Sequence, residues 1–297
     1  SIYSNPAFRT VHSNLLLKYK HKNTMAGNFL SSLFFFMGSF SGSVATTVNF
    51  LEPYLSAFIT RSYRYGKYAA NVHQPVVEKL EVPKRWFKHF YAYSGPTSLH
   101  MFLFSVSPEC TLLATTLFTI HCCKRLYETH CVSIFSNSNI NISHYMVGFI
   151  HYTGLLACLI GESKGFIKGS EEVFSWEKIT FFQILCAVIF LLSSYAQLHA
   201  NYILRDLRRQ KDGKVVHATY KVPYGGLFEY VSGALQLTEI LIYVSGSLIL
   251  WQSSTYHWIT YWVVINQTET AIFTHKWYHK TFKDYPKTRK ALIPYVY

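Results

Sequence analysis

Seven stretches of the chain, each close to 20 residues long, contain very few charged side chains. A helix of about 20 mostly apolar residues is long enough to cross the hydrocarbon core of a bilayer. In the first stretch, Gly38 and Gly42 have the small-xxx-small spacing that lets two helices approach closely. We therefore predict an all-α, polytopic membrane protein with about seven transmembrane helices, at 29–51, 87–106, 108–127, 144–161, 179–200, 231–251 and 256–274.

The composition excludes the main soluble classes. Charged residues make up 14% of the 297 residues, against about 25% in a typical soluble domain. The apolar content of 50% excludes a disordered chain. The formal net charge is +13, but the basic residues lie in segments between apolar stretches. That pattern favours anionic lipid headgroups or an anionic cofactor over nucleic acid as the partner.

The six cysteines indicate neither a metal site nor a disulfide framework. Cys122 and Cys123 are adjacent, and no CxxC pair occurs. Zinc sites and small disulfide-rich domains depend on paired spacings that this chain lacks. We expect reduced thiols and no bound metal.

The basic residues predict the orientation of the spans. Segments 61–88, 124–125, 205–221 and 276–290 together carry 21 Lys and Arg, and the segments on the opposite side carry 7. Under the positive-inside rule this bias places the N-terminus in the lumen and the C-terminus in the cytosol. Residues 1–24 are interpreted as a basic leader that need not be native, and 25–297 as one seven-helix membrane domain.

Several ionisable residues lie inside or beside the apolar stretches, where they are costly and therefore candidates for function. Glu239 lies within the sixth stretch, and His121, Arg125 and Glu128 follow at i, i+4 and i+7 at the end of the third. On a helix, this spacing lets Arg125 bridge to Glu128 while His121 points deeper. The alternatives are an ion pair that anchors the helix end at the headgroups and, for Glu239, an interhelical hydrogen bond.

The segment 201–226, interpreted as a loop, combines cations with a turn. Arg205, Arg208 and Arg209 fall at i, i+3 and i+4 and form one basic face with Asn201, which suits the binding of a phosphate or pyrophosphate. Pro223 and the pair Gly225–Gly226 are expected to turn the chain so that backbone N–H groups meet an anion. The alternative is a basic anchor of the positive-inside type. No GxGxxG or P-loop motif is present, so a bound nucleotide would occupy a helical site.

The C-terminal segment carries the most distinctive pattern, His275-x-Trp-Tyr278, then Asp-Tyr-Pro-Lys-x-Arg289 and Ala-Leu-Ile-Pro294. This pattern, together with Lys221-Val-Pro-x-Gly-Gly-Leu-Phe-Glu-Tyr-Val-Ser followed by Glu239, resembles the steroid 5α-reductase family. Stretches at 64–67, 82–91 and 125–136 resemble its polyprenol reductase branch. The resemblance covers about residues 60–297 and is most specific in 200–297.

The resemblance implies an NADPH-dependent membrane reductase that saturates a C=C bond conjugated to a carbonyl, with seven transmembrane helices and a cofactor site facing the cytosol. It assigns catalysis to His275, Tyr278 and Glu239, and cofactor binding to Arg205, Arg208, Tyr220, Lys221 and Arg289. The spacing arguments add Asn201 and Arg125 on the cofactor side, and His121 and Glu128 as candidates on the substrate side.

The chain departs from the family pattern at two positions that bear on the substrate. Leu235 stands where the family usually has Asn or His, so we expect Gln236 or Gln197 to supply the missing amide. Cys122 replaces a Tyr that meets the carbonyl in steroid-reducing relatives, which argues against a steroid.

The resemblance implies a long-chain isoprenoid lipid substrate, polyprenol or polyprenal, in the endoplasmic reticulum membrane, where its reduction supplies dolichol for protein N-glycosylation. No obligate protein partner is inferred. An allylic alcohol has no conjugated carbonyl, so we expect the aldehyde to be the reactive species. The alternatives are a steroid 5α-reductase, a trans-2-enoyl-CoA reductase, or a lipid-binding member with impaired catalysis.

Overall fold

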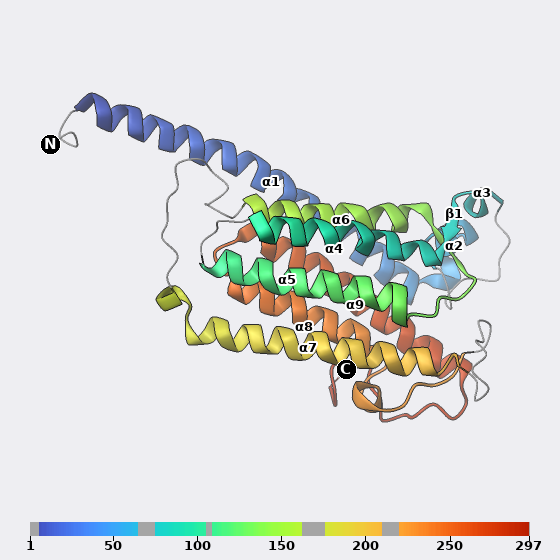
Figure 1. Cartoon of the computed structure of the whole chain (residues 1–297). Helices are drawn as coiled ribbons and strands as arrows, with labels where there is room; N and C mark the ends of the chain where they lie inside the picture. Colours follow the sequence, from blue (N-terminus) through green and yellow to red (C-terminus); the bar gives the residue numbers. More distant parts are fainter. Residues whose placement is uncertain (1–5, 65–74, 105–108, 162–175, 210–219, 297) are drawn as a thin grey trace.

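The computed structural model describes residues 6–64, 75–104, 109–161, 176–209 and 220–296, and is mostly helical. Long helices lie side by side in one bundle, and the N-terminal part of the first projects beyond the others (Figure 1). Within the described residues these helices are α1 (Pro6–Phe50), α4 (Lys88–Phe104), α5 (Glu109–Tyr127), α6 (Ile142–Gly161), α7 (Phe181–Asp206), α8 (Ala234–Ile249) and α9 (Ser254–Thr281).

Among the described residues, three segments are both long and apolar enough to cross a membrane: Asn28–Phe50 of α1, Ile142–Gly161 (α6) and Phe181–Asp206 (α7). Helix α8 is apolar but shorter. Long helices also cover the other predicted stretches. The described part of the chain is therefore mostly helical with three candidate membrane-spanning helices, and the count of seven spans and the orientation of the termini stay predictions.

Local sequence explains where several helices begin and end. Thr180 caps α7 in a reciprocal capping box with Gln183, which satisfies N–H groups that have no partner inside the helix. Ser253 caps α9 by accepting a hydrogen bond from the Tyr256 N–H. Helix α5 begins with Glu109 and ends with Lys124 and Arg125, charges that suit its macrodipole.

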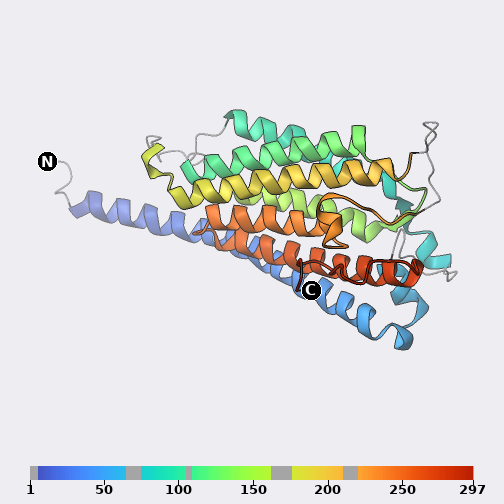
Figure 2. The same cartoon turned by 90° about the horizontal axis from the view of Figure 1, so that it is seen from below.

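The helices pack in neighbouring pairs, α1 with α9, α4 with α5, and α7 with α8. Figure 2 shows α1 running obliquely along α9. A methyl group added at Gly38 would lie 2.5 Å from the Tyr261 ring, and one at Gly42 would lie 2.8 Å from Ile265. The close helix approach predicted from these two glycines is confirmed.

Short elements gather at the end of the bundle where α5 and α7 end and α4 and α8 begin. Strands β1 (Glu81–Pro83) and β2 (Asn139–Asn141) pair antiparallel, with Val82 opposite Ile140. The other short elements are η2 (Glu52–Tyr54), α2 (Ala57–Tyr63), α3 (Pro75–Glu78), η4 (Lys84–Phe87), η5 (Glu128–Val132), η7 (Trp176–Lys178), at the opposite end of the bundle, and η8 (Gly226–Glu229).

The C-terminal segment folds back onto the chain that precedes α8. The Ser232 N–H donates to the Lys290 carbonyl at 2.8 Å, and the Gly233 N–H donates to the Ala291 carbonyl at 3.0 Å. A methyl group at Gly233 would lie 2.9 Å from that same carbonyl, so the position admits only glycine without a shift. The two segments that carry the most specific motifs are thus one structural unit.

Candidate active site

A cavity of about 310 Å³ opens at this end of the bundle, between η4, α4, α5, η5, α7, the start of α8 and the end of α9. Among the described residues that line it, five are basic and none is acidic. The remaining lining residues are largely apolar or hydroxyl-bearing. Its volume lies at the lower end of the range for small-molecule sites, about 300–1,000 Å³. The basic lining residues are Lys84, Arg125, Arg205, Arg208 and Lys221.

The end of α7 supplies one wall. Asn201 and Arg205 lie in its last two turns, and Arg208 follows directly. The interpretation of 201–206 as loop was wrong, because the helix continues to Asp206. Arg208 donates through Nη1 to the Ile134 carbonyl at 2.9 Å, and its guanidinium lies 5.8 Å from the Tyr220 ring centroid. Asn201, Arg205, Arg208 and Tyr220 do share one cavity, as expected for a phosphate-binding face, whereas Arg209 is exposed and lies outside the lining.

Lys84, in η4, faces Arg208 across the cavity wall. Burial and, to a smaller extent, the positive charge of Arg208 together lower the pKa of its amine to about 8. Two cations held so close together favour an anion between them, because the anion relieves their repulsion. The basic residues present therefore fit the phosphate groups of a nucleotide.

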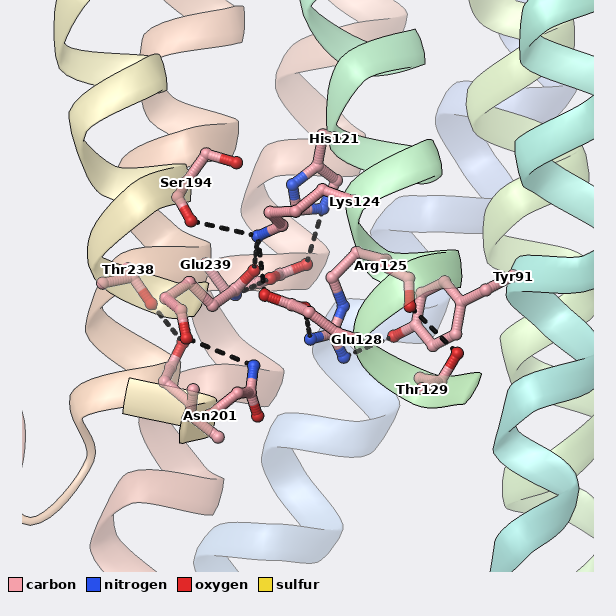
Figure 3. Close-up of polar contacts among 12 residues, drawn as sticks. Tyr91, His121, Lys124, Arg125, Glu128, Thr129, Ser194, Asn201, Thr238 and Glu239 are labelled. Atoms are coloured by element: carbon pink, nitrogen blue, oxygen red, sulfur yellow. Dashed lines mark hydrogen bonds and ion pairs between the residues drawn. The ribbon is translucent and has the colours of Figure 1, made fainter. Parts of the chain in front are cut away.

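The inner wall holds a buried ion pair. Arg125 Nη1 lies 2.5 Å from Glu128 Oε2, and Arg125 Nη2 donates to the Tyr91 hydroxyl at 2.9 Å. The Glu128 side chain is fully buried, and Lys124 Nζ approaches its other oxygen at 3.4 Å. Figure 3 shows Arg125 between Glu128 and Tyr91. The predicted Arg125–Glu128 bridge is confirmed; Arg125 and Tyr91 line the cavity, whereas Glu128 lies behind them.

Deeper in the bundle, Glu239 joins α8 to α5 and α7. Its Oε1 lies 3.8 Å from His121 Nε2, and its Oε2 accepts a hydrogen bond from the Gln197 amide. Gln197 Oε1 in turn accepts from Lys124 Nζ at 2.5 Å. His121 and Glu239 come together as Figure 3 shows, but neither lines the cavity. The Gln197 amide is thus bonded to Glu239. Neither Gln197 nor Gln236 lines the cavity, whereas Leu235 does.

Of the two predicted catalytic residues of the tail, Tyr278 lines the cavity and His275 does not. Tyr278 lines the cavity, and its ring stacks on Tyr285 with centroids 5.0 Å apart. His275 lies outside the lining; its Nδ1 is 2.8 Å from the Ser232 hydroxyl, and the same hydroxyl is 2.7 Å from the Tyr285 hydroxyl. His275 thus connects α9 to the segment before α8.

Arg289 is buried and lies outside the lining as well. Its Nη1 donates to the Pro223 carbonyl at 2.7 Å, and Nη2 lies 3.8 Å from Glu229. It therefore tethers the tail to the turn that carries Lys221.

The predicted turn at Gly225 and Gly226 is confirmed, with φ values of 95° and 54° that are easily reached only by glycine. The anion that its backbone contacts is a carboxylate of this chain. The Gly225 N–H donates to the Glu229 carboxylate at 2.5 Å. The turn therefore serves to place Lys221 rather than to bind a ligand through that N–H.

Sequence reasoning gave no role to Lys84, Tyr91 or Ser232. Lys84 and Tyr91 lie in the stretch 82–91, which resembled the polyprenol reductase branch, but nothing in their spacing indicates a cavity. Their positions depend on η4 and on the packing of α4 against α5, which bring them to residues far away in sequence.

The fold and the cavity define a helical membrane protein with a cation-rich site at one end of its bundle. Residues 136–297 match the family described as 3-oxo-5-alpha-steroid 4-dehydrogenase. The chain is 35% identical to the polyprenal reductase of Drosophila melanogaster over 96% of this chain and 97% of the relative. It is 32% identical to that of Caenorhabditis elegans, over 89% and 96%, and 30% identical to the human one, over 73% and 79%.

The chain therefore belongs to the steroid 5α-reductase family, as its C-terminal motifs indicated. Members of this family are membrane reductases that act on a C=C bond, and the reaction implies a nicotinamide cofactor.

Proposed function

We propose that the protein uses NADPH to reduce the C=C bond next to the aldehyde of polyprenal, which yields dolichal. The cavity carries this proposal, because it joins a cationic wall to apolar residues such as Phe87, Leu204 and Leu235. The phosphates of a dinucleotide need the cationic wall, and an isoprene unit needs the apolar residues. The relatives named polyprenal reductase, which match most of the chain, support the same substrate.

Arg205, Arg208, Lys221 and Lys84 would hold the phosphate groups of NADPH, with Asn201 and Tyr220 on the same wall. Arginine suits this task because its planar fork forms two parallel hydrogen bonds to a phosphate. When bound, the cofactor supplies a hydride. Tyr278 lines the cavity and would contact a ligand. Glu239 and His275 lie outside the lining and would position the side chains that they contact, His121 and Gln197 for Glu239 and Ser232 for His275.

The pKa of Lys84 leads to a pH dependence. Protonated Lys84 attracts a phosphate, and raising the pH through about 8 removes that charge. We expect affinity for NADPH to fall about tenfold between about pH 7 and pH 9, the size of one charge-assisted hydrogen bond. Fluorescence titration of the Lys84→Met variant should give weaker binding with a flatter pH profile. Lys79→Met, an exposed lysine outside the cavity, should keep the wild-type profile; a wild-type profile in Lys84→Met would contradict the assignment.

The orientation of the cavity accords with a cytosolic cofactor. The C-terminal ends of α5, α7 and α9 meet there with the N-terminal end of α8. These are the ends at which the basic segments 124–125, 205–221 and 276–290 lie. We infer seven spans with the N-terminus in the lumen and the C-terminus in the cytosol. The protein would act in the endoplasmic reticulum membrane and supply dolichol for N-glycosylation.

The aldehyde is the substrate that this chemistry favours. Hydride is a nucleophile and needs an electron-poor β-carbon, together with a donor that stabilises the oxygen as charge develops. Polyprenol offers no such carbon. Purified protein should therefore oxidise NADPH with polyprenal and leave polyprenol unchanged. Saturation of polyprenol in the absence of any aldehyde would contradict this choice. A faster reaction with an enone steroid or an enoyl-CoA would assign the protein to another branch of the family.

A further inference from the structure

Tyr91 occupies a distinct place in the cavity. It comes from the first turn of α4 and, together with Phe87 at the end of η4, forms an apolar and aromatic part of the lining. The other two tyrosines of the lining belong to the tail side. Tyr278 stacks on Tyr285, and the Tyr220 ring lies 5.2 Å from Trp277 with Arg208 above it. Tyr91 thus lines the cavity from α4, whereas Arg205 and Arg208 line it from the end of α7.

The hydrogen bond from Arg125 restricts the direction of the Tyr91 O–H bond. A guanidinium only donates, so the phenol oxygen accepts in the 2.9 Å contact. The phenol proton must then point elsewhere, and the structure gives it no acceptor among the described residues. Arg125 is itself held by Glu128 at 2.5 Å, and its guanidinium lies 4.7 Å from the Tyr91 ring centroid. The phenol is a positioned proton donor that faces the cavity.

We propose that Tyr91 is a catalytic residue whose hydroxyl donates a hydrogen bond to the aldehyde oxygen of the isoprenoid substrate. This inference rests on the proposed function and names the group that polarises its substrate. An aldehyde oxygen accepts hydrogen bonds and donates none, so it fits a phenol whose one hydrogen-bond partner in the described part of the chain is a donor.

The proton balance follows from this contact. As the β-carbon gains a hydride equivalent, the electron pair of the C=C bond moves toward the carbonyl and negative charge develops on the oxygen. The O–H bond of Tyr91 breaks and a new O–H bond forms on the substrate, which leaves a phenolate beside Arg125. As the carbonyl re-forms, the O–H proton of the enol returns to the Tyr91 phenolate, and the α-carbon takes up one proton from solvent. One hydride and one proton are consumed for each C=C bond.

Tyr91→Phe removes only the hydroxyl, and Tyr93→Phe is a matched control. Tyr93 is on the same helix, is exposed and lies outside the lining, where its hydroxyl accepts from Thr153. We expect Tyr91→Phe to lower kcat about 100-fold, the usual effect of losing an oxyanion or proton donor. Its NADPH affinity should stay within about threefold of wild type, which shows an intact fold. Tyr93→Phe should keep wild-type kcat.

A second readout needs no turnover. Polyprenal labelled with ¹³C at the carbonyl is bound together with NADP⁺, and its carbonyl stretch is recorded by infrared spectroscopy. We expect a shift to lower wavenumber in wild type and in Tyr93→Phe, and no shift in Tyr91→Phe. Wild-type protein carrying 3-fluorotyrosine at 91, a more acidic phenol of similar size, should shift the band further. A band at the wild-type position in both the Tyr91→Phe and the 3-fluorotyrosine proteins would overturn the inference.

The two proposals fail in different ways. If wild type reduces polyprenal and Tyr91→Phe keeps its kcat, the role of Tyr91 is wrong and the function stands. If wild type leaves polyprenal unreduced while the carbonyl band still depends on Tyr91, the function is wrong and the phenol–aldehyde contact stands.

Discussion

The Glu128→Leu variant is expected to lose about 3–5 kcal/mol of stability, the usual cost of removing one partner from a buried ion pair. The Glu128 carboxylate is fully buried, with Arg125 at 2.5 Å and Lys124 at 3.4 Å. Leucine would remove the carboxylate that contacts both of these cations, so their buried charges would lose their nearest anionic partner. Unfolding of the purified protein in mixed detergent micelles, followed by helical circular dichroism, measures the change.

Glu52→Leu is the matched control. Glu52 also pairs with an arginine, Arg64, at 2.7 Å, but its side chain is 42% exposed. An exposed pair contributes less than about 1 kcal/mol because water screens it. Equal losses in the two variants would contradict the view that Glu128 supports the cavity wall. A double variant, Glu128→Leu with Arg125→Met, should recover part of the loss, since it removes an unpaired charge.

Replacing Arg208 with leucine is expected to weaken NADPH binding by about 10- to 100-fold, the value of a hydrogen bond to a charged group. Arg208 lines the cavity beside Lys84 and is oriented by the Ile134 carbonyl. The dissociation constant is measured by fluorescence titration at fixed ionic strength, because phosphate contacts are screened by salt.

Arg209→Leu provides the comparison for that measurement. Arg209 is the next residue, is exposed, and lies outside the lining. The two variants make the same change in net charge, so a general electrostatic effect would weaken binding equally in both. We expect Arg209→Leu to bind NADPH within about twofold of wild type. A similar loss in both variants would mean that the cavity is not the cofactor site.

Helical periodicity predicted which residues lie together on one face of a helix. The spacing of Arg125 and Glu128 placed them on one face, and their bridge is present. Gly38 and Gly42 predicted a close helix contact, which α9 provides. These predictions succeed because a helix fixes the positions of residues three and four apart. The end of α7 was placed too early because basic residues were taken as the start of a loop, although Asn201–Asp206 continue the helix.

Contacts between distant segments could not be predicted in the same way. His121 and Glu239 are far apart in sequence and meet because α5 and α8 pack together. His275 and Tyr278 lie three residues apart on α9, yet only Tyr278 reaches the cavity, because Ser232 holds the imidazole on the side of the tail. Spacing along one helix cannot tell which of two neighbouring faces a partner segment will cover.

The most direct test of the account is the fate of the transferred hydride. Purified protein is given polyprenal and NADPH that carries deuterium at the transferred position, and the product is analysed by mass spectrometry and NMR. The account predicts an aldehyde with one saturated isoprene unit and deuterium on the β-carbon. Deuterium on the former carbonyl carbon, with the C=C bond intact, would show an alcohol-forming reductase and contradict it.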